Sequence, residues 1–89
     1  MKRAIFPGTF DPFTLGHLDI LNRSKLIFDE IIIGIGKNSD KKTMFPINKR
    51  IALIESLIDK GDNVKVMSYE GLTINFCKSV NANFIVRGV

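Results

Sequence analysis

The chain has 89 residues, which is enough for one small domain. Hydrophobic residues make up 45% and charged residues 25%, so the composition is that of a folded domain and excludes a low-complexity or disordered chain. The net charge of +4 suits an anionic partner, but the lysines and arginines are scattered. Because nucleic-acid binders carry a basic stripe with aromatic residues, we expect phosphorylated small molecules and no nucleic acid.

Hydropathy and cysteine content restrict the location of the protein. The longest apolar run, Ile31 to Ile35, contains Gly34 and is far shorter than the roughly 20 residues of a membrane span. The apolar run after the basic N-terminus is too short for a signal peptide. Cys77 is the single cysteine, and no histidine or cysteine partner has metal-site spacing. We therefore expect a cytoplasmic protein with no membrane partner and an inert thiol.

Strands and helices are predicted to alternate along the chain. Period-2 or continuous β-branched runs predict strands at Arg3 to Phe6, Ile31 to Ile35, Val64 to Met67 and Phe84 to Val86. Helix-period segments lie between them. Because crossover helices put successive strands in the same direction, the order βαβαβαβ indicates an α/β fold with a Rossmann-like parallel sheet.

The first helix is expected to begin at Thr14, a plausible N-cap, and to end before Asp29. Its apolar residues recur at helical spacing. The side chains expected to face the core are Leu18, Leu21, Leu26 and Ile27.

The second helix is expected after Pro46, with Asn48 as a possible cap and Gly61 as its C-terminal stop. Its inward side chains follow helical spacing at Ile47, Ile51, Ile54 and Ile58. Arg50, on this helix, is interpreted as ordinary surface charge without a role. The third helix is expected from about Leu72 to Asn81.

The turn after the first strand is predicted to bind phosphate. It contains Gly8 and Thr9 and leads directly into a helix N-terminus, whose unpaired N–H groups attract anions. A lone histidine is usually a solvated or packed residue, but the Thr-x-Gly-His element after this turn favours a function for His17. Asp11 could be a metal ligand, although its place before Pro12 favours a carboxylate that caps nearby amides. Phe10 is expected to pack beside the ligand.

Cations follow two other strands at the same predicted edge. Lys41 lies in the loop after the second strand, and Arg87 ends the last strand. Either could be a simple surface charge, but ligands of parallel sheets bind beyond the carboxyl ends of the strands. The two side chains could therefore grip one phosphate. Gly88 would let the main chain pass close to a nucleotide.

Three motifs together carry a resemblance to a known family. They are the turn from Pro7 to Pro12 with Thr14-x-Gly-His17, the Lys41-Lys42-x-Met44-Phe45 loop, and the strand end from Phe84 to Gly88. In order and spacing they resemble bacterial phosphopantetheine adenylyltransferases over the whole chain. The Thr-x-Gly-His element alone would indicate only the wider nucleotidyltransferase superfamily. Since members of the family continue further, residues 1–89 resemble the N-terminal half of a nucleotidyltransferase domain that is incomplete at its C-terminus.

The resemblance implies a reaction and a homo-oligomer, which is hexameric in the family. An adenylyl group would pass from ATP to 4'-phosphopantetheine, giving dephospho-CoA and pyrophosphate, with Mg²⁺ on the triphosphate. His17 is implied as the catalytic residue, which stabilises charge around the α-phosphorus. The implied ATP contacts are Thr9, Phe10, His17, Gly88 and Val89. The implied contacts to the phosphopantetheine substrate are Thr9, Lys41, Thr73 and Arg87.

Other functions remain open at this point. A related enzyme could transfer an adenylyl or cytidylyl group to another phosphorylated acceptor. The chain could also be a non-catalytic module that binds phosphopantetheine or dephospho-CoA without turnover. The stretch from Tyr69 to Thr73 could line the organic arm of a ligand or serve only in packing.

Overall fold

The computed structural model describes residues 1–37, 42–59 and 61–87. Their element order confirms the predicted alternation of strands and helices. The elements are β1 (Arg3–Gly8), α1 (Leu15–Ser24), β2 (Glu30–Gly36), α2 (Ile47–Leu57), β3 (Val64–Tyr69), α3 (Thr73–Ser79) and β4 (Phe84–Ile85).

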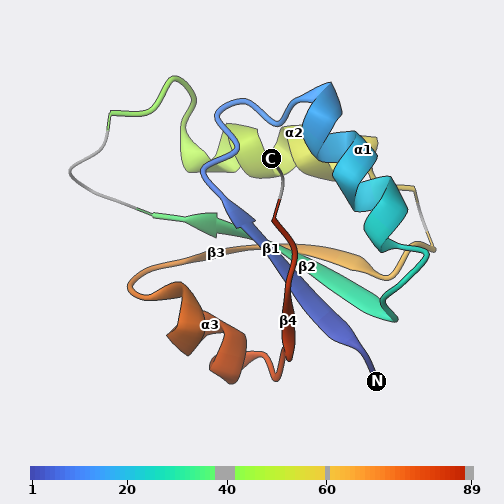
Figure 1. Cartoon of the computed structure of the whole chain (residues 1–89). Helices are drawn as coiled ribbons and strands as arrows, with labels where there is room; N and C mark the ends of the chain where they lie inside the picture. Colours follow the sequence, from blue (N-terminus) through green and yellow to red (C-terminus); the bar gives the residue numbers. More distant parts are fainter. Residues whose placement is uncertain (38–41, 60, 88–89) are drawn as a thin grey trace.

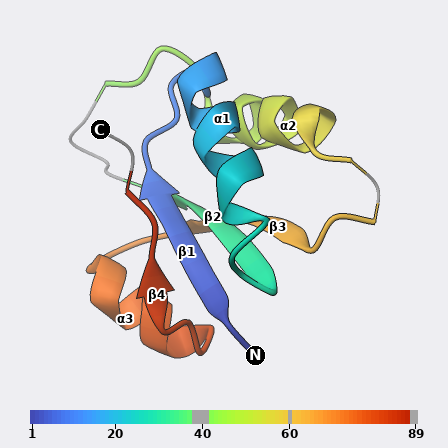
Figure 2. The ribbon, with the colours of Figure 1, turned by 45° about the vertical axis from the view of Figure 1, so that its right-hand side comes forward.

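The strands form one parallel sheet in the order β3-β2-β1-β4. From β1 the chain moves outward to β2 and β3, and it then crosses back to place β4 on the other side of β1 (Figure 1). Helices α1 and α2 lie on one face of the sheet and α3 on the other, as both ribbon views show (Figures 1 and 2). The Rossmann-like arrangement that the sequence predicts is therefore confirmed.

Strand β2 is buried on both faces. Ile31, Ile32, Ile33 and Ile35 are each 3% exposed or less. A strand covered by helices on both sides has no solvent face, which explains its continuous apolar sequence. Two cores result from this layering.

On one face, Leu21 of α1 and Ile54 of α2 pack against Phe6 and Ile33. On the other face, Phe76 of α3 packs with the sheet residues Ile5 and Ile32. Leu21, Ile54 and Phe76 are all residues that the apolar periodicity predicts to face inward.

Helix α1 is shorter than predicted. It ends at Ser24, and Leu26 and Ile27, which were expected in the core, are 88% and 63% exposed. The Ser24 hydroxyl donates to the carbonyl of Ile20, and the Ile27 N–H donates to the carbonyl of Ser24. This tight bonding turns the chain away from the helix axis, so the next two apolar side chains leave the buried stripe.

The ends of α2 differ from the prediction. Pro46 is the N-cap residue, with φ −61° and ψ 156°, and no side chain caps the helix. Asn48 is therefore not a cap but a residue of the first turn, because the fixed φ of proline lets the helix begin at once. The helix ends at Leu57, and Ile58 is already extended. Gly61, with φ +97°, forms a later left-handed turn instead of stopping the helix.

Helix α3 and strand β4 are also shorter than their patterns. Leu72 occupies the N-cap position of α3 without a side-chain cap, and Val80 follows the last helical residue. The helix is therefore shorter at both ends than the predicted range from about Leu72 to Asn81. The Val86 N–H still donates to the Ile5 carbonyl at 2.8 Å, which extends the contact of β4 with β1 by one bond. Among the described residues, no helix is both long and apolar enough to cross a membrane.

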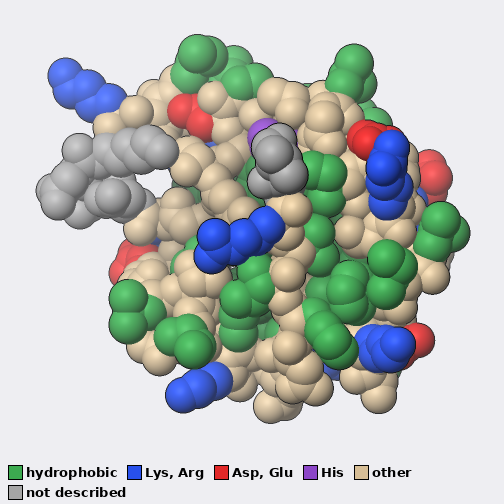
Figure 3. Space-filling view, in the orientation of Figure 1, with side chains coloured by type: hydrophobic (Ala, Val, Ile, Leu, Met, Phe, Trp, Pro, Cys, Tyr) green, Lys and Arg blue, Asp and Glu red, His purple; other side chains and the backbone are tan. Residues whose placement is uncertain are grey.

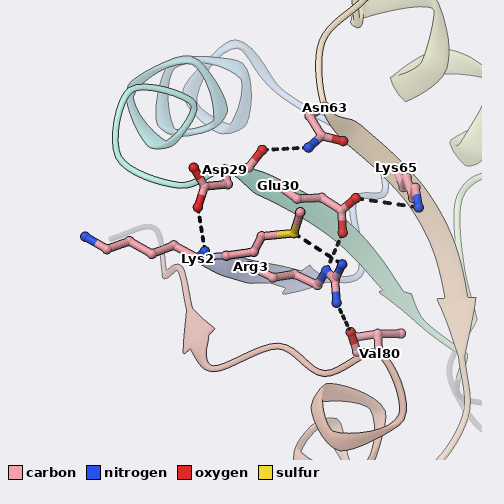
Figure 4. Close-up of polar contacts among 8 residues, drawn as sticks. Lys2, Arg3, Asp29, Glu30, Asn63, Lys65 and Val80 are labelled. Atoms are coloured by element: carbon pink, nitrogen blue, oxygen red, sulfur yellow. Dashed lines mark hydrogen bonds and ion pairs between the residues drawn. The ribbon is translucent and has the colours of Figure 1, made fainter.

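An ionic cluster holds the amino ends of the strands together, opposite the edge expected to bind ligands (Figure 4). Glu30 at the start of β2 is 6% exposed and accepts from Arg3 of β1. Its other carboxylate oxygen lies 3.5 Å from Lys65 Nζ on β3. Arg3 also donates from Nη1 to the Val80 carbonyl at 2.9 Å. The cluster therefore links the first three strands to the end of α3.

Candidate functional site

Two adjoining cavities open where the carboxyl ends of the strands meet. The first has a volume of about 1010 Å³ and the second of about 640 Å³. Pro7 and Gly8 at the end of β1 and Thr9 directly after it line both cavities. This segment, called the shared turn below, therefore separates the two cavities. The cavities lie where the strand order reverses around β1, which is the usual ligand position in open parallel sheets.

The second cavity brings together four of the residues singled out from the sequence. Thr9, Phe10, His17 and Arg87 all line it. Arg87 is exposed, and His17, the single histidine of the chain, is half-buried and reaches the surface (Figure 3). Guanidinium and imidazole N–H groups around one cavity are suited to phosphate oxygens.

His17 is fixed in orientation by the N-cap of α1. The Thr14 N–H donates to His17 Nδ1 at 2.9 Å, and the His17 N–H donates to Thr14 Oγ1 at 3.3 Å. Because Nδ1 accepts a hydrogen bond, the proton of the neutral ring lies on Nε2. Burial lowers the pKa of His17 below its ordinary value of 6.5. His17 is therefore a neutral hydrogen-bond donor at pH 7.

Aromatic side chains surround the imidazole. The ring centroids of Phe10 and Phe13 lie 5.0 Å and 5.3 Å from that of His17. Phe10 is 3% exposed and has φ +50°, in the left-handed region. A Cβ at Gly8 would lie 3.0 Å from Phe10 Cζ, so only glycine leaves room for the ring. Phe10 is therefore a packing residue, as expected, and its contact with a ligand stays a prediction.

Thr73 and Tyr69 also line the first cavity. Tyr69 Oη and Thr73 Oγ1 lie 2.8 Å apart and share a hydrogen bond. The Tyr69 ring stacks on Phe76, with centroids 4.4 Å apart and an interplanar angle of 5°. These residues therefore pack and also line the cavity, and contact with the organic arm of a ligand stays a prediction.

Arg50 is the site residue that the sequence interpretation missed. It was expected on the solvent side of α2, but it is 6% exposed and lines the first cavity. Its guanidinium donates to the carbonyls of Thr9 and Phe45, at 2.9 Å and 3.0 Å. A sequence signal existed, because Arg50 lies three residues after Ile47 and four before Ile54, on the inward face of the helix.

Asp11 caps backbone amides, as its position before proline predicts. Its carboxylate accepts from the N–H groups of Met44 and Phe45, the latter at 2.8 Å. Among the described residues, no group of three or more His, Cys, Asp or Glu side chains could hold a metal ion.

Some predicted contacts stay untested by the geometry. Lys41, Gly88 and Val89 lie outside the described residues. Lys37, just before the undescribed residues 38–41, and Thr43, two residues after them, both line the first cavity. The described ends of this loop therefore border the first cavity.

The family model and the related sequences that match this chain all extend over nearly its whole length. The cytidylyltransferase-like family model matches residues 5–89. Over all of its residues, the chain is 55% identical to the phosphopantetheine adenylyltransferase of Bacteroides thetaiotaomicron and 53% identical to that of Christiangramia forsetii. The corresponding identity with the Lachnoclostridium phytofermentans enzyme is 46%. The chain spans 59%, 59% and 55% of the lengths of these three relatives.

Solved structures share the fold. The lipopolysaccharide core biosynthesis protein of Thermoplasma volcanium superposes with a TM-score of 0.75 and 29% identity, covering 96% of this chain and 72% of that one. A bifunctional NMN adenylyltransferase/ADP ribose pyrophosphatase from Francisella tularensis gives a TM-score of 0.70 at 23% identity. The match covers 94% of this chain and 31% of the larger protein, and it bears on the fold alone.

Proposed function

Since this chain belongs to the cytidylyltransferase-like family, we propose that it provides the phosphate-binding part of a phosphopantetheine adenylyltransferase. The reaction would transfer an adenylyl group from ATP to 4'-phosphopantetheine and give dephospho-CoA and pyrophosphate. The choice of acceptor rests on curated relatives of that name that match all residues of the chain.

The main observation behind this proposal is that the two cavities adjoin at the shared turn. Thr9 lines both cavities, so ligands in the two cavities would meet at this residue. We place 4'-phosphopantetheine in the first cavity and ATP in the second. An oxygen of the acceptor phosphate would attack the α-phosphorus. The new P–O bond would form as the bond to the bridging oxygen breaks, and pyrophosphate would leave with that electron pair.

His17 would act on the transferring phosphoryl group. A neutral imidazole with its proton on Nε2 donates a hydrogen bond, and such a bond strengthens as negative charge builds on the α-phosphate oxygens. Thr14 holds the ring before the ligand arrives, so the donor needs no reorganisation. The chemistry requires no covalent intermediate and relies on positioning and electrostatics.

Cations would hold the acceptor phosphate. Arg87 lines the second cavity beside the shared turn. From there it would reach the acceptor phosphate where the two cavities meet and bind its oxygens together with Thr9 and Lys41. Thr73, in the first cavity, would contact the pantetheine arm. Gly88 and Val89 would begin the adenine-nucleotide side.

Mg²⁺ would enter with the triphosphate. In nucleotide sites this ion usually keeps several waters and binds substrate phosphates in addition to one or two carboxylates. The Asp11 carboxylate already accepts from two backbone amides. Among the described residues that line the second cavity, Asp19 supplies the single carboxylate, so the ion would be held mainly by ATP, whose charge it would partly neutralise.

A cytoplasmic location and a homo-oligomer remain part of the proposal. The free thiol of Cys77 is buried, which suits a reducing compartment. Large apolar side chains such as Leu53, Leu57 and Met67 are 39–42% exposed around α2 and β3, which suits contact between copies. Sedimentation velocity would show whether the chain forms the hexamer expected from the resemblance.

The decisive experiment is pyrophosphate release from Mg-ATP by this chain, with and without 4'-phosphopantetheine. Release that depends on the acceptor would establish the reaction and show that residues 1–89 are sufficient for it. The matched variant His17→Ala should lower kcat by about 10²- to 10³-fold while acceptor affinity changes little. An unchanged rate in this variant would remove His17 from the mechanism.

Two further arms separate the alternatives. Nicotinamide mononucleotide in place of 4'-phosphopantetheine tests a different acceptor, and we expect no release with it. Calorimetric titration with 4'-phosphopantetheine tests binding without turnover. Binding without release would favour a non-catalytic module, and neither binding nor release would contradict the proposed function.

A further inference from the structure

Two charged side chains fasten the turn after β1 to the segment that leads into α2. Arg50 donates from Nη1 to the Thr9 carbonyl at 2.9 Å and from Nε to the Phe45 carbonyl at 3.0 Å. Asp11 reaches across from the turn and accepts from the N–H groups of Met44 and Phe45. Phe45 is therefore held through both its carbonyl and its N–H, by side chains of opposite charge.

These ties flank a strained residue. Phe10 has φ +50°, a conformation that non-glycine residues adopt only when their surroundings hold them there. The Arg50 bond acts on the carbonyl just before Phe10, and the Asp11 carboxylate acts from the residue just after it. The clamp, which we define as Arg50 and Asp11 with their backbone partners, therefore anchors both sides of the strained position.

The clamp also sets the direction of one backbone donor. In a planar trans peptide the C=O and N–H point in opposite directions. Because Arg50 holds the Thr9 carbonyl, the Phe10 N–H points away from α2. Arg50 lines the first cavity, whereas Phe10 lines the second, on the other side of the shared turn. No backbone–backbone hydrogen bond between described residues uses the Phe10 N–H.

We propose that Arg50 is a positioning residue for the reaction proposed above, on which this inference rests. Arg50 acts through the peptide between Thr9 and Phe10 and keeps the Phe10 N–H directed toward the cavity that contains His17. Asp11 completes the clamp by fixing Phe45. Neither side chain needs to contact the transferring group, and a guanidinium is required because it spans two carbonyls at once.

Kinetics of the full chain test this role. Arg50→Gln removes the positive charge. Arg50→Lys keeps the charge, but its single ammonium nitrogen cannot donate to both carbonyls in the geometry of the guanidinium. Both should lower kcat by about 100-fold, as expected for a displaced ligand-binding turn, with little change in the KM for 4'-phosphopantetheine. Lys49→Gln is the matched control, because Lys49 is the exposed neighbour of Arg50 on α2 and loses the same charge. A wild-type kcat in Arg50→Lys would overturn the proposal.

Hydrogen exchange in the ligand-free chain gives an independent readout. In Arg50→Gln the Phe45 amide should exchange about 10-fold faster, while the amide of Ile33 in the central strand keeps its rate. Asp11→Asn should produce the same local pattern and serves if Arg50→Gln does not fold. An unchanged Phe45 rate in both variants would show that the clamp does not hold the turn. Absence of both acceptor binding and turnover in the wild type would overturn the proposed function, and exchange would still decide whether the clamp exists.

Discussion

At the scale of single residues, His17 couples the shape of the site to pH. Its Nδ1 can accept the Thr14 N–H only while that nitrogen is unprotonated. Burial lowers the pKa of His17 from 6.5, so the unfolded chain binds a proton more readily than the folded chain. The free energy of unfolding therefore decreases as the pH falls. The contribution is complete above about pH 6.5 and is lost as the pH falls through the lowered pKa.

Urea unfolding at about pH 7.5 and about pH 5 measures this effect. Wild type should lose more stability between the two pH values than His17→Gln, whose side chain does not titrate. Equal losses would contradict a depressed pKa.

Gly34 is required by close packing. A Cβ at this position would lie 2.8 Å from Phe76 Cε2 and 3.1 Å from Tyr69 Cε1. Gly34→Ala should therefore destabilise the protein by about 1–3 kcal/mol, as overpacking does. Gly36→Ala is the control, because its nearest neighbour is the Tyr69 hydroxyl at 3.5 Å. Thermal unfolding of the two variants compares them, and equal melting temperatures would refute the packing argument.

The sequence motif identified most of the residues that line the cavities, but the general preference of arginine for the surface led to a wrong prediction for Arg50. Thr9, Phe10 and His17 stand in a turn that predicts phosphate binding, and they do line the second cavity. Arg50 was interpreted as surface charge because arginine is usually exposed. Its burial depends on carbonyl partners at Thr9 and Phe45, which are separated in sequence and meet only in the folded chain.

At the scale of elements, the N-cap of α1 combines two tasks. Thr14 and His17 form a reciprocal capping box, with each side chain bonded to the backbone N–H of the other residue. The cap satisfies a helix N–H that would otherwise lack a partner, and it also aims the imidazole. The start of this helix is therefore part of the site.

Thr14→Ala should cost about 1 kcal/mol of unfolding free energy, the typical value for a lost N-cap. Thr14→Ser keeps the oxygen and should stay close to wild type. Chemical denaturation of the two variants gives the comparison. A serine variant as unstable as the alanine variant would show that the methyl group, and not the cap, is responsible.

Element types were predictable, but their ends were not. Strand β2 is buried on both faces and has an apolar run that identifies it directly. The end of α1 is set by the turn bonds after Ser24, so Leu26 and Ile27 continue the apolar pattern without being buried. An apolar residue past a helix end looks, in sequence, the same as one within the helix.

At the scale of the whole molecule, Glu30 connects strands at the edge opposite the cavities. Its buried carboxylate contacts Arg3 of β1 and Lys65 of β3. Glu30→Gln removes the charge from this cluster and should cost about 1–3 kcal/mol. Asp19→Asn is the control, since the Asp19–Arg23 pair has side chains 61% and 79% exposed and should contribute little. Equal melting temperatures for the two variants would contradict a structural role for the cluster.

The edge of the sheet that holds the candidate site could be predicted from the sequence, but its division into two cavities could not. The rule that ligands bind beyond the carboxyl ends of parallel strands places Thr9, Thr73 and Arg87 at one edge. The two cavities on either side of the Thr9 turn depend on side-chain packing across several elements, which no motif encodes. The predicted role of Lys41 in binding the acceptor phosphate stays a prediction.

The position of β4 in the sheet has a consequence for the order of folding. Phe84 pairs with Ala4 across nearly the whole chain, and β4 itself has two residues. Closing so long a loop costs more entropy than pairing β1 with β2, and few contacts compensate for it. We expect β4 to join last, so that pulse-labelling exchange finds the Val86 amide protected after that of Ile33. Arg87 follows this strand and lines the second cavity. This side of the cavity would therefore be the last part of the site to form on folding and the first to be lost on unfolding.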